Sequence, residues 1–403
     1  MQTNWKIGSL FGIPLFIDPL WFVILGLAIL NFGLSYSQWG TILGWSAGIV
    51  MALLLFGSVL LHELGHSLAA QSQGIKVNSI TLFLFGGIAS IEEESKTPSQ
   101  AFQVAIAGPV VSIFLFLICW AVSNFLSDAT PAKMILGDLA RINCVLALFN
   151  LIPGLPLDGG QVLKAALWKI TGNRFQAVRL AGRAGQILGY GAIALGLFVD
   201  YLTGELISGL WIAFLGSFAI RNATSYIRVT NLQETLMAMK ASDVMTRDYR
   251  VVEANQSLRD FADFYLLQHT TSQTSNSQIY FAVSDGRYRG MVLVDNFRIM
   301  ERSLWDSQTL DSIIRPLTEI PFVSESTSLV DVIIKIEDEG LNFLTILSPA
   351  GAVAGVLDRG DIVKALAEKL NLKINDAEIK YVKENRQYPS GLQLAALAKS
   401  TKN

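Results

Sequence analysis

Long apolar runs separated by short polar stretches dominate the first half of the chain. Residues 19–61 contain no charged side chain and are interrupted only by the polar patch 35–38. Because a bilayer core needs about 20 apolar residues per helix, two membrane spans fit here, at roughly 19–35 and 41–66. Further apolar runs follow at 102–127, 142–157, 184–199 and 206–220. The pattern predicts a polytopic α-helical membrane region with about six transmembrane helices.

The run at 142–157 differs from the others. It is interrupted by Pro153, Gly154 and Pro156, and Asp158 follows it. A segment broken by proline and glycine at membrane depth is tolerated only where its backbone lines a site or is packed inside protein. A kinked helix end is the alternative interpretation.

From about residue 241 the pattern changes to short strands and helices, and it repeats. Residues 290–296 match residues 355–361 at an offset of 65. Each repeat is predicted to run turn, strand, helix, two strands, helix, with a polar loop at 270–278 in the first. The predicted division is a transmembrane domain (1–222), a linker (223–240), a soluble α/β pair (241–370, with repeats at about 241–300 and 309–367) and a polar C-terminal tail (371–403), expected to be a helix with a frayed end.

Charge supports this division and orients the spans. Residues 1–222 carry 21 of the 64 charged side chains, and the net charge of −2 gives no indication of nucleic-acid binding. The connection 161–184 has five basic side chains and no acid, so the positive-inside rule places it in the cytoplasm. Counting spans from there places both termini in the cytoplasm. We expect a multi-pass protein of a prokaryotic plasma membrane, with an organelle membrane as the alternative.

The second predicted span ends in His62-Glu63-Leu64-Gly65-His66. Residues four apart in a helix lie on one face, about 6 Å apart along the axis, so the two imidazoles can bind one zinc ion. Glu63 can then act as general base toward the attacking water. The pattern also occurs by chance in helices, but this chain has only three histidines. Ionisable groups within a membrane span are usually functional, which favours a metal site.

A catalytic zinc ion typically has three protein ligands. His269 lies in a polar stretch of the soluble half and is expected at the surface, and the run Glu92–Glu94 is expected to be a solvated cluster. Asp158 is the better candidate because Gly159 and Gly160 beside it allow close backbone approach. The span count also places Asp158 at the same depth as the histidine pair.

The histidine motif and the segment Asn150–Gly160 (Asn-Leu-Ile-Pro-Gly-Leu-Pro-Leu-Asp-Gly-Gly) together resemble the site-2 protease family of intramembrane zinc metalloproteases. The resemblance covers roughly residues 5–222 and includes three shorter matching pieces: Gly12-Ile13-Pro14, Phe85-Gly86-Gly87 and Ala107-Gly108-Pro109. It implies that His62, His66 and Asp158 bind one zinc ion and that Glu63 is the catalytic base.

The resemblance also implies a role for Asn150, whose amide would help to hold the tetrahedral intermediate. It further implies that the β-prone stretch 80–90 forms a strand near the metal, which could pair with an unwound substrate. A plain loop or a core strand without substrate contact is the alternative.

The repeats of the second half resemble a cystathionine-β-synthase (CBS) domain pair. That resemblance implies an adenosyl nucleotide in the cleft between the repeats, with Asp361 at the position of a ribose-binding aspartate. The match is incomplete, because Asp358 replaces the usual threonine or serine and the first repeat has Leu293 and Asn296 instead. A structural role or a homodimer through the CBS pair is the alternative.

The sequence therefore predicts an intramembrane zinc metalloprotease in a lipid bilayer. It would cleave single-span membrane proteins within or beside their transmembrane segments, in regulated intramembrane proteolysis. The CBS pair would be a regulatory or dimerising module. A zinc transporter would spread its ligands along a path, and a non-catalytic chaperone or sensor would have a damaged motif. Ligands at one depth and an intact Glu63 favour the protease.

Overall fold

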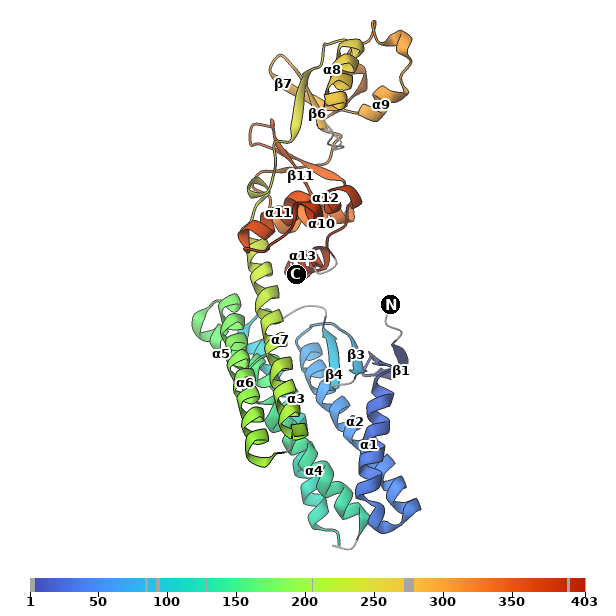
Figure 1. Ribbon diagram of the computed structural model, residues 1–403, viewed down its shortest axis with the longest axis vertical. Helices are drawn as coiled ribbons and strands as arrows, with labels where there is room; N and C mark the ends of the chain where they lie inside the picture. The colour runs from blue at the N-terminus through green and yellow to red at the C-terminus, as the bar shows by residue number, and fades with distance from the viewer. Residues whose placement is uncertain are drawn as a thin grey trace. The chain divides into compact units, whose positions relative to one another are not determined.

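The computed structural model describes residues 4–83, 86–91, 95–127, 130–204, 206–271, 279–389 and 392–402. The chain forms two compact units, Met1–Thr230 and Asn231–Asn403. The first unit consists of helices and a small sheet, and the second is an α/β unit (Figure 1).

A small sheet opens the first unit. Its strands within the described residues are β1 (Trp5–Leu10), β2 (Ile13–Ile17), β3 (Val77–Phe83) and β4 (Gly86–Ile91), in that order across the sheet. Strands β2 and β3 are parallel, with Leu15 opposite Ile80, and β3 and β4 are antiparallel. The β-prone stretch 80–90 thus belongs to two strands, and β4 lies at the sheet edge. The hairpin β1–β2 was not predicted.

The helices of this unit are α1 (Trp21–Ser35), α2 (Thr41–Ser72), α3 (Pro98–Asn124), α4 (Pro131–Asn150), α5 (Asp158–Thr171), α6 (Arg174–Thr203) and α7 (Leu206–Ala238), the last of which continues into the second unit. Among the described residues, α2, α3 and α6 are long and apolar enough to cross a membrane, and α1 is apolar but shorter. The region is therefore confirmed as helical with three candidate membrane spans among the described residues, and the count of six spans stays a prediction.

Helix α2 is the central element, because small residues let its neighbours approach closely. A Cβ on Gly48 would lie 2.6 Å from the backbone nitrogen of Gly33 in α1, and one on Gly65 would lie 3.0 Å from the carbonyl oxygen of Ala107 in α3. The inner face of the sheet also packs on α2, through Ile13, Leu15 and Leu64. The histidine motif is thus held between α3 and the sheet.

The predicted broken span at 142–157 is not one segment. Helix α4 begins at Pro131 and ends at Asn150, a turn follows, and Asp158 begins α5. Pro153 and Pro156 cause the break, since proline has no N–H to donate and restricts the residue before it. Asp158 therefore begins a helix instead of ending a span.

The second unit contains both repeats in the predicted order of elements, except that the second begins with an additional short strand that joins the sheet of the first. The first has β5 (Tyr249–Glu253), α8 (Leu258–Thr271), β6 (Ile279–Ser284), β7 (Arg287–Val292) and α9 (Val294–Ile299); the second has β8 (Ile314–Pro316), β9 (Phe322–Ser324), α10 (Leu329–Asp338), β10 (Phe343–Leu347), β11 (Val353–Asp358) and α11 (Arg359–Lys369). The sheets run β5-β6-β7-β8 and β11-β10-β9. Phe281, Val353 and Val356 are buried in one cluster that joins the repeats.

The C-terminal tail is more ordered than predicted. Two helices, α12 (Asp376–Asn385) and α13 (Leu394–Lys402), follow the second repeat. Leu394 and Ala398 are fully buried in the same core as Leu329 and Ile333 of α10. The expected frayed end is wrong because these apolar side chains complete that core.

Candidate metal centre

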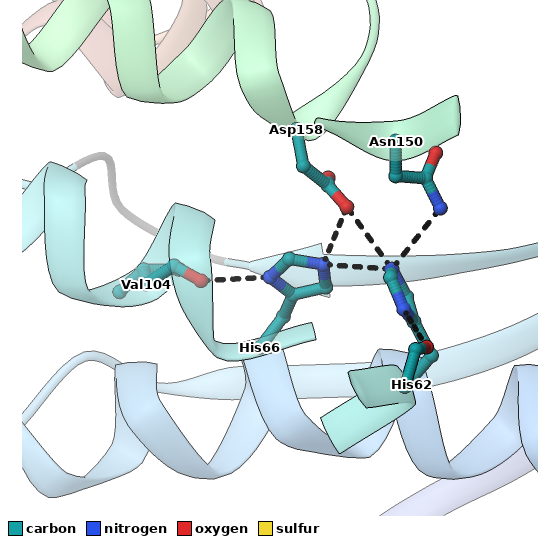
Figure 2. Close-up of polar contacts among 6 residues, drawn as sticks. His62, His66, Val104, Asn150 and Asp158 are labelled. Carbon is teal, nitrogen blue, oxygen red and sulfur yellow. Dashed lines mark hydrogen bonds and ion pairs between the residues drawn. The ribbon is translucent and has the colours of Figure 1, made fainter. Parts of the chain in front are cut away.

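Three side chains from distant parts of the sequence converge in the first unit. His62 and His66 lie on one face of α2, and Asp158 approaches them from the start of α5 (Figure 2). One ligand atom from each lies within 4.8 Å of the others. The side chains are largely buried, with exposures of 4%, 12% and 21% for His62, His66 and Asp158. Within the described residues, this is the group of histidines and acids whose arrangement suits a metal ion.

The distances between the ligand atoms fit a tetrahedral zinc ion. Asp158 Oδ2 lies 3.0 Å from Nε2 of His62 and 3.3 Å from Nε2 of His66, and the two Nε2 atoms are 3.3 Å apart. Ligands held at about 2.0–2.1 Å by a tetrahedral ion lie about 3.3–3.4 Å from one another. The three atoms are thus already spaced for zinc.

Hydrogen bonds at Nδ1 of each imidazole leave Nε2 to face the metal. Nδ1 of His66 is 2.7 Å from the carbonyl oxygen of Val104, which can only accept, so the ring donates there and a lone pair remains on Nε2. Nδ1 of His62 is 2.9 Å from Ser112 Oγ. A hydroxyl can accept a hydrogen bond, so the Nδ1-protonated tautomer leaves a lone pair on Nε2 of His62 as well. In that tautomer the two lone pairs and the carboxylate repel unless a cation lies between them, so the donor set fits a metal ion.

Glycines leave room beside the ligands. A Cβ on Gly108 of α3 would lie 2.2 Å from Nε2 of His66 and 2.7 Å from Nε2 of His62. A Cβ on Gly87 of β4 would lie 2.4 Å from Cγ of Glu63. Helix α3 and the edge strand β4 therefore approach the motif closely, and β4 runs directly against Glu63.

The turn between α4 and α5 positions Asp158 and Asn150. The backbone nitrogen of Leu155 donates to the carbonyl oxygen of Ala181 in α6 at 3.3 Å. A Cβ on Gly159 would lie 2.2 Å from the carbonyl oxygen of Leu151, so the predicted close backbone approach is present. Asn150, the last residue of α4, has its Nδ2 atom 3.5 Å from Nε2 of His62. Its amide therefore faces the same point as the ligands (Figure 2).

The other residues that the sequence singled out do not join this centre. His269 belongs to α8 in the second unit. The run Glu92–Glu94 and Phe85 lie outside the described residues. Asp361 is in the second repeat, where its carboxylate accepts from the backbone nitrogen of Asp358 at 3.1 Å and from Nζ of Lys383 at 2.7 Å. These contacts cap α11 and attach α12 to it.

Sequence reasoning missed the contribution of α3. Val104, Gly108 and Ser112 are spaced four residues apart and therefore form one face of the helix, which lies against both histidines. The motif Ala107-Gly108-Pro109 pointed to this helix, but a backbone carbonyl and a lone serine carry no signal in the sequence.

Two family models match parts of this chain. The model of Peptidase family M50 matches residues 50–138 and 126–188, and the CBS domain model matches residues 311–368. The putative zinc metalloprotease sll0528 of Synechocystis sp. is 40% identical over 91% of this chain and 96% of its own length. The putative zinc metalloprotease Rip3 of Mycobacterium tuberculosis is 31% identical over 86% of this chain and 89% of its own.

A solved structure, the site-2 protease from Methanocaldococcus jannaschii, is 28% identical and covers 56% of this chain and 95% of that chain, with a TM-score of 0.39. The sequence relatives, together with the ligand set, define a zinc metalloprotease of a membrane. The chain belongs to peptidase family M50, the site-2 proteases, and it carries a C-terminal CBS domain.

Proposed function

We propose that this protein hydrolyses peptide bonds within or next to the transmembrane segments of single-span membrane proteins, in regulated intramembrane proteolysis. The observation that carries the proposal is the convergence of His62 and His66, both in an apolar helix, with Asp158. Ionisable groups are costly among apolar helices, so metal ligands buried there indicate a reaction that takes place at the membrane.

Each residue of the centre has a proposed role. His62, His66 and Asp158 would hold one zinc ion, which would supply Lewis-acid polarisation of the scissile carbonyl and of the attacking water. Glu63 lies next to the first ligand in α2 and takes a proton from that water, then gives it to the leaving amine. The Asn150 amide, directed at the same point, donates to the oxygen that becomes negative in the transition state.

The edge strand β4 is the proposed substrate contact. A transmembrane helix has its amides satisfied internally, so a segment of the substrate must unwind before cleavage. Strand β4 pairs with β3 on one side and runs against Glu63. An extended substrate segment that pairs with the free edge of β4 would therefore lie beside the general base.

The membrane arrangement is proposed from the charge pattern. We infer six spans within residues 1–222 and place both termini in the cytoplasm of a prokaryote, because the basic connection 161–184 is expected there. Residues 241–370 then form a cytoplasmic CBS pair that regulates the protease or joins two copies. A nucleotide that bound at Asp361 would have to displace Lys383 from its carboxylate.

The test uses the purified full-length protein in detergent with a tagged substrate that has one transmembrane helix. Wild type, Glu63→Gln and chelator-treated wild type are compared, and zinc is then restored to the treated sample. We expect cleavage by wild type, a loss of about 10²–10⁴-fold in Glu63→Gln with one zinc ion still bound, and recovery with restored zinc. Glu253→Gln, an exposed glutamate of β5, is the matched control. Equal cleavage by wild type and Glu63→Gln would sink the mechanism.

A further inference from the structure

Helix α3 supplies a hydroxyl to the metal centre at a position that no sequence motif identifies. Ser112 Oγ lies 2.9 Å from Nδ1 of His62. Ser112 is fully buried, and so is nearly all of His62. Water therefore cannot replace this hydrogen bond if the hydroxyl is removed.

The other nitrogen of His62 explains why the hydroxyl matters. Nε2 faces Asp158 Oδ2 at 3.0 Å and Nε2 of His66 at 3.3 Å, so it is the atom that must carry a free lone pair if the ring is to bind a metal. A neutral imidazole has one proton, which must then be on Nδ1. Ser112 Oγ is the acceptor for that proton.

Without the hydroxyl, the tautomer of His62 with its proton on Nε2 becomes the more favourable one. An Nδ1–H group would be buried with no acceptor, which is unfavourable. The alternative tautomer, with the proton on Nε2, would instead donate to the Asp158 carboxylate. That proton would occupy the position where the ring has to bind the metal.

The two histidines differ in how they are supported. His66 donates to a backbone carbonyl, that of Val104, which no side-chain substitution removes. His62 depends on a side chain eight residues further along the same face of the helix, that of Ser112. The orientation of one ligand is therefore open to change by a single substitution.

We propose that Ser112 is a positioning residue that fixes the proton of His62 on Nδ1 and the orientation of its ring, and so sets the affinity of the centre for zinc. The inference rests on the proposed function only in taking the three ligands to bind zinc. It concerns metal binding and does not require that any particular substrate be cleaved.

The experiment compares Ser112→Ala with Ser67→Ala in the full-length protein. Ser67 is equally buried, lies next to His66 in α2, and its Oγ has no hydrogen-bond partner among the described residues. Zinc affinity is measured by competition with a chelator of known affinity. The visible absorption of the cobalt-substituted protein reports the coordination geometry. Thermal unfolding of the metal-free forms shows whether either substitution acts on folding instead.

We expect Ser112→Ala to bind zinc about 10–100-fold more weakly and to change the cobalt spectrum, because partners of metal-ligating histidines have effects of this size. Ser67→Ala should stay close to wild type, and Ser112→Thr, which keeps the hydroxyl, should recover most of the affinity. If Ser112→Ala does not fold, Ser112→Cys, a poor acceptor of similar volume, gives the same comparison.

Wild-type zinc affinity in Ser112→Ala, or an equal loss in Ser67→Ala, would overturn the proposal. Its failure is separable from failure of the proposed function. Glu63-dependent cleavage with unchanged zinc affinity in Ser112→Ala removes the positioning role alone. A Ser112-dependent zinc affinity in a protein that cleaves no membrane substrate removes the proteolytic function alone.

Discussion

The space beside the two histidines makes Gly108 the most informative position for a single methyl group. An alanine there would place Cβ 2.2 Å from Nε2 of His66 and 2.7 Å from Nε2 of His62. Ordinary contact between non-bonded heavy atoms is about 3.5 Å, so the rings would have to move by about 1 Å. Both rings are held at Nδ1 by α3, and neither can turn away without losing that hydrogen bond.

The size of the effect follows from the tolerance of metal coordination. Ligand distances must stay within about 0.2 Å of their usual values, so a shift of about 1 Å removes good ligation from both histidines. Loss of a single partner behind a ligand costs about 10–100-fold in affinity. We therefore expect Gly108→Ala to weaken zinc binding by more than about 100-fold, or about 2.8 kcal/mol. The better helix propensity of alanine, about 0.5–1 kcal/mol, does not offset this clash, because overpacking a buried site costs about 1–3 kcal/mol.

The test measures metal binding and folding separately. Zinc affinity by chelator competition and thermal unfolding of the metal-free protein are measured on the same samples. Gly57→Ala is the control, because Gly57 lies in α2, five residues before His62, and a Cβ there meets nothing within 4 Å. A Gly108→Ala protein that binds one zinc ion with wild-type affinity would refute the geometry described for α3.

Three further predictions concern other contacts. Asn150→Ala should lower kcat by about 10²–10³-fold with zinc content unchanged, as measured by cleavage and metal analysis, because an oxyanion donor acts only in the transition state. Burial and the charge of Asp358 raise the pKa of Asp361, while Lys383 opposes them. Lys383→Met should therefore cost the second unit about 1.5–3 kcal/mol at neutral pH, as measured by thermal unfolding. The substitution raises the pKa of Asp361 further, and this costs folding stability only at a pH where Asp361 is ionised in the unfolded chain. The loss of stability should therefore shrink as the pH falls toward about 4, and a loss that does not change with pH would contradict the prediction. Leu394→Ala should destabilise the same unit by about 2–5 kcal/mol without changing zinc binding, and no change in unfolding would mean that α13 does not complete the core.

Local patterns predicted the parts of the molecule that local physics determines. The spacing of His62 and His66 needs only a helix, and the apolar runs need only a bilayer, so both could be predicted without the fold. The two prolines after Asn150 signalled a break, but the start of a new helix at Asp158 depends on the packing of the turn against α6. The sequence cannot show such a contact between distant segments.

The features that escaped prediction are of the same kind. Ser112 matters only because α3 lies against α2, and a serine inside an apolar helix has no signature of its own. Leu394, Leu397 and Ala398 have the spacing of one face of a helix, but the sequence of so short a segment does not show what that face packs against. Strand β1 has exposed side chains throughout, so it lacks the alternation by which strands are predicted.

The separation of the metal ligands along the chain has a consequence for stability as well as for chemistry. Asp158 follows His62 by 96 residues, and the turn before it is joined to α6 through Leu155 and Ala181. A metal ion shared by these ligands is a cross-link that closes a long loop of the chain and ties α2 to α5, much as a disulfide would. Chelation should therefore loosen the contact between these helices and expose the turn at 151–157 to digestion, in addition to stopping catalysis. Activity lost on metal removal would then have two causes, the looser packing of the helices and the absence of the ion from the reaction.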